Sequence, residues 1–171
     1  MFSKNLFTPK NNRFIFCLII LASFGSVAFA LFSQYHDLVE PCPLCIAQRV
    51  IYFLIGLVAI FAFFHKSLSF PSKVYALILL AIAAFGAKVA YHHVWLQSLP
   101  PEQWPASCGM PLSVLYKQIP LTGFIHTILS GTAECAMINW KVFGISGPFL
   151  SLCNFILIAL LALYPLIVKN K

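Results

Sequence analysis

The chain has 171 residues, of which 61% are hydrophobic and only 9% are charged. Soluble domains carry roughly 25% charged residues, so this composition excludes an ordinary water-soluble enzyme and also a disordered chain. The net charge of +7 comes from 11 basic and 4 acidic residues, and the basic ones mostly flank apolar segments. That distribution is typical of membrane topology, and no nucleic-acid partner is expected.

Four segments are long and apolar enough to cross a bilayer as helices, which need roughly 20 residues each. They cover about 14–32, 45–64, 74–96 and 148–168. The predicted fold class is therefore an all-α membrane protein, one domain over residues 1–171 built as a bundle of four transmembrane helices. The first and third connections, at about 33–44 and 97–147, are expected on the same side of the membrane.

Lysine and arginine residues predict which side each connection faces, because they collect on the cytoplasmic side. The first connection has none and the long third one has only Lys117 and Lys141. The two tails and the second connection hold the remaining seven basic residues that lie outside the spans: Lys4, Lys10, Arg13, Lys66, Lys73, Lys169 and Lys171. Both termini are thus expected in the cytoplasm. A signal peptide ending near Ala30 is the alternative, but the apolar run is longer than a usual signal core, which favours an uncleaved anchor.

The third connection is the part of the chain able to form structure outside the bilayer. Its first portion contains four prolines, which forbid a long helix there: Pro100, Pro101, Pro105 and Pro111. Residues 121–129 are apolar enough to form a short helix along the membrane surface.

The six cysteines fall into two groups. Cys17 and Cys153 lie inside predicted spans and are expected to be small, buried and inert. The other four lie in the outward connections, where disulfides form: Cys42, Cys45, Cys108 and Cys135. Cys42 and Cys45 have Cys-X-X-Cys spacing, which is typical of reversible dithiol chemistry. Cys108 and Cys135 bracket 26 residues, a loop that a disulfide could close. A four-thiolate zinc site and two inert disulfides remain alternatives.

The surroundings of Cys45 favour the redox interpretation. Cys45 opens the second span, where free backbone N–H groups and the helix dipole favour an anion. Pro43 extends Cys42 ahead of that turn. Arg49 follows on the same helix face, about 6 Å deeper. A permanent cation just inside the bilayer is costly and marks a candidate site for an anionic ligand, with snorkelling to the headgroups as the alternative.

The third span ends on the same side with Tyr91-His92-His93-Val94-Trp95. His93 is expected at nearly the depth of Arg49, and adjacent residues point about 100° apart, so one of the two histidines should face the bundle. An interfacial aromatic belt with incidental histidines is the alternative. The sequence does not decide whether Lys88, deeper in this span, faces the bundle or the lipid.

Taken in order, these pieces resemble the DsbB family. Its members are bacterial inner-membrane proteins that reoxidise the periplasmic thiol oxidant DsbA, a relay that keeps the periplasm oxidising. The resemblance rests on Pro41-Cys42-Pro43-Leu44-Cys45 with Gln48-Arg49, then Tyr91-His92-His93 with Leu96-Gln97, then Cys108 and Cys135. It covers the chain from the first span to the fourth.

The resemblance implies a protein-dithiol:quinone oxidoreductase, with ubiquinone or menaquinone taking the electrons. Cys108 and Cys135 would form the disulfide that a reduced DsbA-like, thioredoxin-fold partner attacks, with Cys108 taking the mixed disulfide. Electrons would reach the Cys42–Cys45 disulfide through a transient link between Cys42 and Cys135. Cys45 would face the quinone, Arg49 would stabilise the thiolate and the reduced quinone, and His93 would help there.

Two other functions are weighed against this one. Vitamin K epoxide reductase-like enzymes also combine four helices, Cys-X-X-Cys and a quinone, but there the motif follows the loop cysteines and here it precedes them. A metal-binding or scaffold membrane protein could use the same thiols without turnover. Pro43 within the motif is unusual for the family, and residues 112–133 offer no match, so the surface that docks the partner is not assigned.

Overall fold

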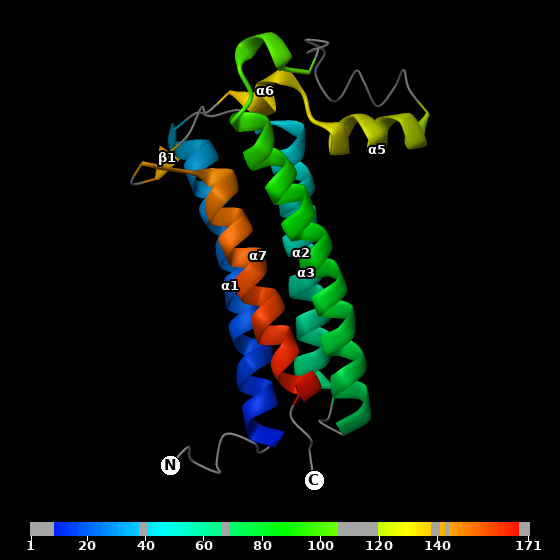
Figure 1. The fold of residues 1–171 in the computed structure, drawn as a ribbon. Coiled ribbons are helices and arrows are strands. Elements are labelled where there is room, and N and C mark those ends of the chain that lie inside the picture. Colours follow the sequence, from blue (N-terminus) through cyan, green and yellow to red (C-terminus); the bar gives the residue numbers. More distant parts are fainter. Residues whose placement is uncertain are drawn as a thin grey trace.

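Four long helices lie side by side in a computed structural model of the chain (Figure 1). They are α1 (Pro9–Asp37), α2 (Pro43–Phe64), α3 (Ser69–Gln97) and α7 (Gly147–Ile167). The structure describes residues 9–37, 41–65, 69–105, 120–137, 141–142 and 144–167. Within these ranges, four helices are long and apolar enough to cross a membrane. The predicted four-helix membrane bundle is confirmed.

Short elements gather at the end of the bundle opposite the start of α1 and the end of α7 (Figure 1). They are the 3-10 turn η2 (Pro101–Gln103), α5 (Leu121–Ser130), α6 (Ala133–Ala136), and the antiparallel strands β1 (Lys141–Val142) and β2 (Ile145–Ser146). The short helix predicted at 121–129 is confirmed as α5, which runs across the direction of the bundle (Figure 1). Residues 106–119, with Cys108, Pro111 and Lys117, lie outside the described residues.

The first and third helices extend beyond the predicted apolar spans. α1 begins at Pro9 and ends at Asp37, although apolar residues cover only about 14–32 of it. α3 likewise covers Ser69–Gln97 rather than 74–96. Backbone hydrogen bonding continues past the hydrocarbon edge, and hydropathy reports the apolar part alone.

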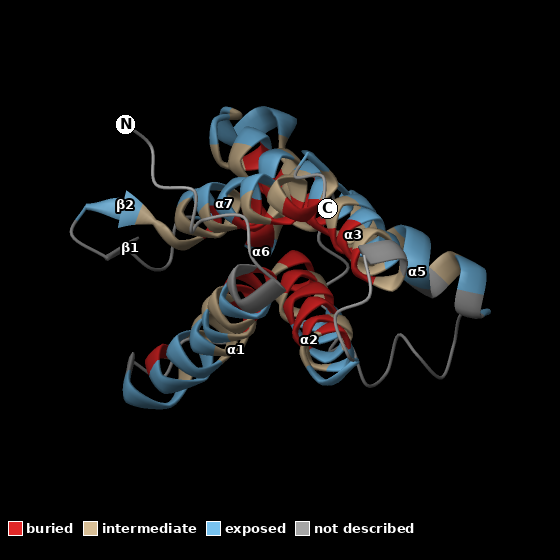
Figure 2. Cartoon of the chain, turned by 90° about the horizontal axis from the view of Figure 1, so that it is seen from below, coloured by how far each residue is buried: buried red, intermediate tan, exposed pale blue. Residues whose placement is uncertain are grey.

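Small residues let the helices approach closely on the inner side of the bundle, where the buried residues gather (Figure 2). A Cβ at Gly86 of α3 would lie 2.5 Å from Cε1 of Phe155 on α7, so that ring packs directly on the glycine. Ala83 and Ala162 are fully buried in the same core. Side chains of this size are typical of membrane helix interfaces, because close packing there replaces the hydrophobic effect.

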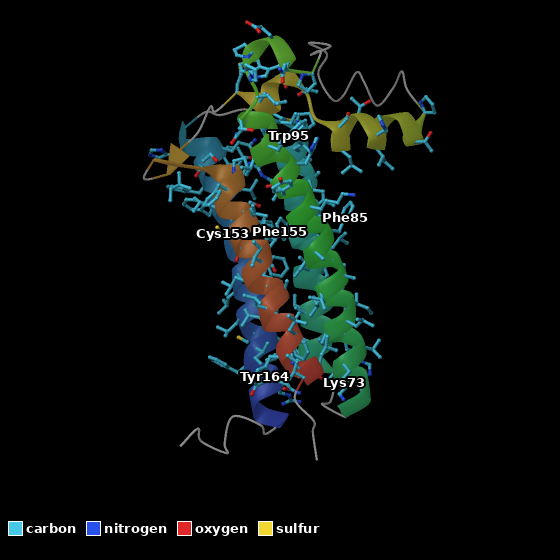
Figure 3. All side chains as sticks on the ribbon, viewed as in Figure 1. Lys73, Phe85, Trp95, Cys153, Phe155 and Tyr164 are labelled. Carbon is cyan, nitrogen blue, oxygen red and sulfur yellow. The ribbon has the colours of Figure 1, made fainter. Side chains whose placement is uncertain are left out.

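The expected burial of the two cysteines inside the spans is wrong for Cys153, which is exposed, and Cys17 is half-buried. Cys153 and the buried Phe155 lie on different sides of α7 (Figure 3). In a membrane helix an apolar residue gains no burial by facing the bundle instead of the lipid, so hydropathy cannot assign the face. Lys88 is also exposed, on the outside of α3.

Candidate active site

Cys42 is the N-cap residue of α2. Its backbone is extended, with φ −67° and ψ 161°, and its Sγ accepts the backbone N–H of Cys45 at 3.4 Å. Pro43 takes the first helical position, where its missing N–H costs no hydrogen bond. The helix therefore begins two residues before the predicted start of the span, and both thiols of the motif lie at its N-terminus.

Three thiols meet at this helix start. The Sγ atoms of Cys42 and Cys45 are 2.8 Å apart. The thiol of Cys135, which α6 carries, is hydrogen-bonded to that of Cys42. Cys135 is completely buried and Cys42 is 8% exposed. Cys42 thus interacts with both other thiols, although 92 residues separate it from Cys135. Cys108 is outside the described residues.

His93 joins α3 to this thiol cluster. Its Nε2 donates to the backbone carbonyl of Cys135 at 3.1 Å and lies 3.7 Å from Sγ of Cys42. A carbonyl oxygen only accepts, so Nε2 carries the proton and Nδ1 accepts from the side-chain amide of Gln48 at 3.3 Å. His93 is 1% exposed, which confirms that one histidine of the pair faces the bundle.

His92 is not an incidental member of an aromatic belt. Its Nε2 donates to the backbone carbonyl of Ser130, the last residue of α5, at 3.0 Å, and its ring stacks on Trp95. Two adjacent histidines of α3 therefore hold two points of one segment, Ser130 and Cys135. This fixes the loop that carries Cys135 against the end of the bundle.

The contacts of the cluster shift its thiol pKa values in opposite directions. Hydrogen bonding with Cys135 and Cys45, together with burial, raises the pKa of Cys42. The Cys42 thiol, acting against burial, lowers the pKa of Cys135 to about 6. A thiolate at Cys135 beside a protonated Cys42 follows, and the thiolate is the form that attacks a disulfide.

In the fully reduced protein we expect Cys135 to lose its thiolate as the pH falls through about 6. It should be about nine-tenths ionised at pH 7 and about one-tenth at pH 5. The pH dependence of thiolate ultraviolet absorbance, taken as the difference between the protein and Cys135→Ser, measures this without a reagent that must reach the buried sulfur. Cys42→Ala removes the hydrogen-bond donor and should move the midpoint toward the ordinary thiol value, whereas Cys17→Ser should not. A midpoint that Cys42→Ala leaves in place would contradict the assignment.

Arg49 is held by α1. Its Nη1 donates to Oε1 of Gln34 and its Nη2 to the carbonyl of Ala30 at 3.2 Å. Among the described residues it forms no ion pair, and it is half-buried. The guanidinium is thus fixed across the α1–α2 interface one helical turn below Cys45.

A cavity of about 240 Å³ opens below the thiols. At about 30 Å³ per water it has room for roughly eight waters, or for one substituted six-membered ring. All four long helices and α6 contribute to its wall: Ser26, Phe29, Ala30, Ser33, Gln34, Pro41, Cys42, Cys45, Gln48, Arg49, Tyr52, His93, Gln97, Glu134, Met137, Gly147, Pro148, Leu150 and Ser151. Of the predicted site residues, the cavity wall includes Cys42, Cys45, Arg49 and His93.

Several wall residues were not identified from the sequence. Ser26, Ser33 and Gln34 recur on α1 at helical spacing, a polar stripe inside an apolar span that could have been recognised. Tyr52 lies one turn below Arg49 and gave no such signal, because an aromatic residue within a span is ordinary core composition.

A bundle of membrane helices with clustered thiols above a cavity defines a class, the membrane proteins of thiol–disulfide chemistry. Within that class the chain belongs to the DsbB family, since the model "Disulfide bond formation protein DsbB" matches residues 12–165.

Relatives named "Disulfide bond formation protein B" are similar along most of their length. That of Acinetobacter baylyi is 42% identical over 166 residues, which are 93% of this chain and 96% of the relative. That of Acinetobacter baumannii is 41% identical over 90% of each chain. The Xylella fastidiosa protein is 38% identical over 88% of this chain and 83% of its own. The chain is therefore a multi-pass membrane protein of disulfide bond formation, and the vitamin K epoxide reductase-like alternative loses its support.

Proposed function

We propose that this protein is a dithiol:quinone oxidoreductase of the bacterial inner membrane. It would reoxidise a periplasmic, DsbA-like thioredoxin-fold partner and pass the electrons to ubiquinone or menaquinone. The observation that carries the proposal is Cys42, whose thiol touches both Cys135 of the loop and Cys45 at the roof of a membrane cavity. One sulfur there links a site for a protein with a site for a lipid-soluble molecule.

Four thiol–disulfide exchanges carry the electron pair from the partner to Cys42 and Cys45. The reduced partner attacks a Cys108–Cys135 disulfide, forms a mixed disulfide with Cys108 and releases Cys135 as a thiolate. That thiolate attacks Cys42 of the Cys42–Cys45 disulfide, so a Cys42–Cys135 bond forms and Cys45 leaves as a thiolate. Cys135 attacks as a thiolate, which is the nucleophilic form of a cysteine. The partner's second thiol closes its own disulfide and frees Cys108. Cys108 then attacks Cys135, which restores the loop disulfide and releases Cys42, so Cys42 and Cys45 are left as the reduced pair whose two electrons a bound quinone would accept.

The residues around the cavity fit a quinone head group. Phe29, Pro148 and Leu150 provide apolar wall, and Arg49 offers a fixed cation. A bound quinone supplies a two-electron, two-proton acceptor. Cys45 lies at the cavity in the first turn of α2, where backbone N–H groups favour an anion, so its thiolate is held where the acceptor would bind.

Redox poise explains why such an acceptor is required. DsbA-type oxidants have potentials near −120 mV, while structural disulfides lie below about −300 mV. Electrons flow spontaneously from a reduced structural dithiol to an oxidised DsbA-type protein. The reverse reaction, in which a structural disulfide oxidises the reduced partner, would be uphill by roughly 8 kcal/mol, at about 1.4 kcal/mol per 30 mV. A membrane quinone is a more oxidising acceptor, so electron transfer to it is not uphill in this way. A chain embedded in the bilayer has access to the quinone.

The proposed orientation puts the thiol end outside the cytoplasm. Lys73 lies near the opposite end of α3, the end at which α1 begins and α7 stops (Figure 3). Arg13 belongs to the first part of α1 at that same end. Arg13 and Lys73 therefore obey the positive-inside rule if the end of the bundle where α1 begins is cytoplasmic.

The test mixes the purified protein, a reduced DsbA-like protein and decylubiquinone or a short-chain menaquinone, and follows quinone absorbance. We expect quinone reduction that matches partner disulfide formation one for one. Partner oxidation without quinone reduction, or neither, would overturn the proposal.

Arg49→Lys keeps the charge but replaces the two guanidinium nitrogens that bond Gln34 and the Ala30 carbonyl with a single ammonium nitrogen on a different geometry. Loss of one such bond should raise the KM for quinone about three- to tenfold, with little change in the KM for the protein partner. Lys88→Gln, which removes an exposed cation elsewhere on α3, is the control. Equal effects of the two substitutions would remove Arg49 from the site.

A metal site is the second candidate, because ligand atoms of Cys42, Cys45 and His93 lie within 4.8 Å of one another. Both ring nitrogens of His93 are already engaged, with the Cys135 carbonyl and with Gln48. Metal analysis after mild reduction separates the two functions, since a redox relay should hold no stoichiometric zinc.

A further inference from the structure

A cluster of polar side chains lies at the deep end of the cavity and joins three helices. The Tyr52 hydroxyl of α2 donates to the Ser151 carbonyl of α7 at 2.9 Å. The Asn154 amide, also on α7, donates to Oγ of Ser26 on α1 at 2.7 Å and to the Ala22 carbonyl at 3.3 Å. Tyr52 is within hydrogen-bonding reach of Asn154 and Ser26 as well.

This cluster faces the cavity at a defined depth below Arg49. Ser26, Tyr52 and Ser151 all belong to the cavity wall. On α2, Tyr52 follows Arg49 by three residues, about 4.5 Å along the helix. On α1, Ser26 lies four residues, about 6 Å, from Ala30, whose carbonyl binds Arg49. The two hydrogen-bonding ends of the cavity are therefore about one ring's width apart.

The wall between these two ends is rigid. The Tyr52 ring stacks on Phe155 with 4.1 Å between centroids and 3° between planes. Phe155 in turn packs on Gly86 and points into the bundle (Figure 3). The position of the Tyr52 hydroxyl, and with it that of Ser26, is thus fixed by the helix core rather than by a flexible side chain.

Within the cluster, Ser26 has a proton left to donate. A serine hydroxyl has one donor and two acceptor sites, and Asn154 uses an acceptor site of Ser26. The Tyr52 proton is directed to Ser151. Ser26 can therefore donate to the Tyr52 oxygen or to a molecule in the cavity.

We propose that the Ser26 hydroxyl, oriented by Asn154 and Tyr52, binds the ring oxygen of the quinone that lies remote from Arg49. The inference rests on the proposed quinone function and narrows the substrate to rings with two oxygens on opposite sides. Each such oxygen accepts hydrogen bonds only, and burying one without a donor is costly. Arg49 serves one oxygen and Ser26 serves the other.

The chain offers a matched control one helical turn away. Ser23 is fully buried on α1, its Oγ has no partner among the described residues, and it is not part of the cavity wall. Ser26→Ala and Ser23→Ala each remove one hydroxyl from the same helix, and alanine is the best helix former. Only the first removes a hydroxyl from the cavity.

The measurement is the Kd of decylubiquinone for the purified, detergent-solubilised protein, read from quinone-dependent thermal stabilisation. Ser26→Ala should weaken binding about two- to tenfold, the effect of one hydrogen bond. Ser26→Thr should retain the affinity, and Ser23→Ala should match the unsubstituted protein. Infrared spectra of the bound quinone should show one carbonyl band shifted to higher frequency in Ser26→Ala and neither band shifted in Ser23→Ala.

The outcomes separate this inference from the proposed function. If the unsubstituted protein binds no quinone, both are overturned. If it binds and reduces quinone but Ser26→Ala keeps the same Kd and carbonyl bands, the inference alone is overturned. Equal weakening by both alanine variants, or a loss of melting temperature without a change in Kd, would make the cluster a structural link between helices.

Discussion

Cys42→Ser is expected to reduce electron transfer from the reduced partner to quinone below detection. Cys42 is the sulfur in contact with both Cys135 and Cys45, so its loss leaves no bond through which electrons can pass between loop and cavity. Serine preserves the N-cap of α2, since its oxygen can accept the Cys45 N–H, and the fold should persist.

Cys45→Ser distinguishes the central sulfur from the terminal one. In that variant the Cys42 thiol can attack Cys135 of a Cys108–Cys135 disulfide, so a Cys42–Cys135 bond should accumulate and release the Cys108 thiol. Non-reducing peptide mapping detects this bond, and the same mapping should find no cross-link of Cys45 to Cys135 in Cys42→Ser.

Cys153→Ser is the control for both variants, because Cys153 is exposed on α7 and away from the cluster. It should keep normal turnover. Quinone reduction that survives Cys42→Ser would contradict the relay, as would a Cys42–Cys135 bond that never forms in Cys45→Ser.

The sequence predicts the spans well because hydropathy and length measure the property that the bilayer selects. It places the start of α2 two residues late, at Cys45 instead of Pro43, although Cys42-Pro43 is both an extended dipeptide and a helix opening. The faces of the helices are less accessible to such reasoning. Cys153 and Lys88 point outward, and no hydropathy pattern distinguishes a lipid-facing side from a buried one.

The contact between Cys135 and Cys42 could not be predicted from spacing. It depends on a long loop that returns to the bundle and is held by His92 and His93 through backbone carbonyls, which are present in every sequence. Only the resemblance to DsbB suggested a link between these two cysteines. Tyr52 at the deep end of the cavity was missed for a related reason, because an aromatic residue is ordinary in an apolar span until the folded helices bring it beside Ser151, whereas Ser26 belongs to a polar stripe that the sequence does show.

The return of that loop depends on a glycine between α5 and α6. Gly131 has φ +79° and ψ 166°, a region open essentially to glycine alone. A Cβ there would lie 2.6 Å from Cδ1 of Leu96 and 2.9 Å from Cδ1 of Leu44. Leu44 lies between the two cysteines of the motif, so the glycine packs directly against the thiol-bearing turn.

Gly131→Ala should therefore lift α6 from the start of α2. Backbone strain of about 1–3 kcal/mol lowers the docking equilibrium constant about fivefold to 150-fold, before the clash with Leu44 and Leu96 is added. In a Cys45→Ser background, formation of the Cys42–Cys135 bond should slow by that factor. Cys135, which is completely buried in the unsubstituted protein, should become reactive toward a thiol reagent in the variant.

Gly144→Ala is the matched control for backbone strain. Gly144 also has a positive φ, +84°, but a Cβ there meets nothing within 4 Å, and it belongs to the turn between β1 and β2. It should leave both the cross-linking rate and the protection of Cys135 unchanged. If Gly131→Ala also left them unchanged while the bundle remained folded, the loop would reach Cys42 without the close glycine contact, and the two histidines alone would hold it in place.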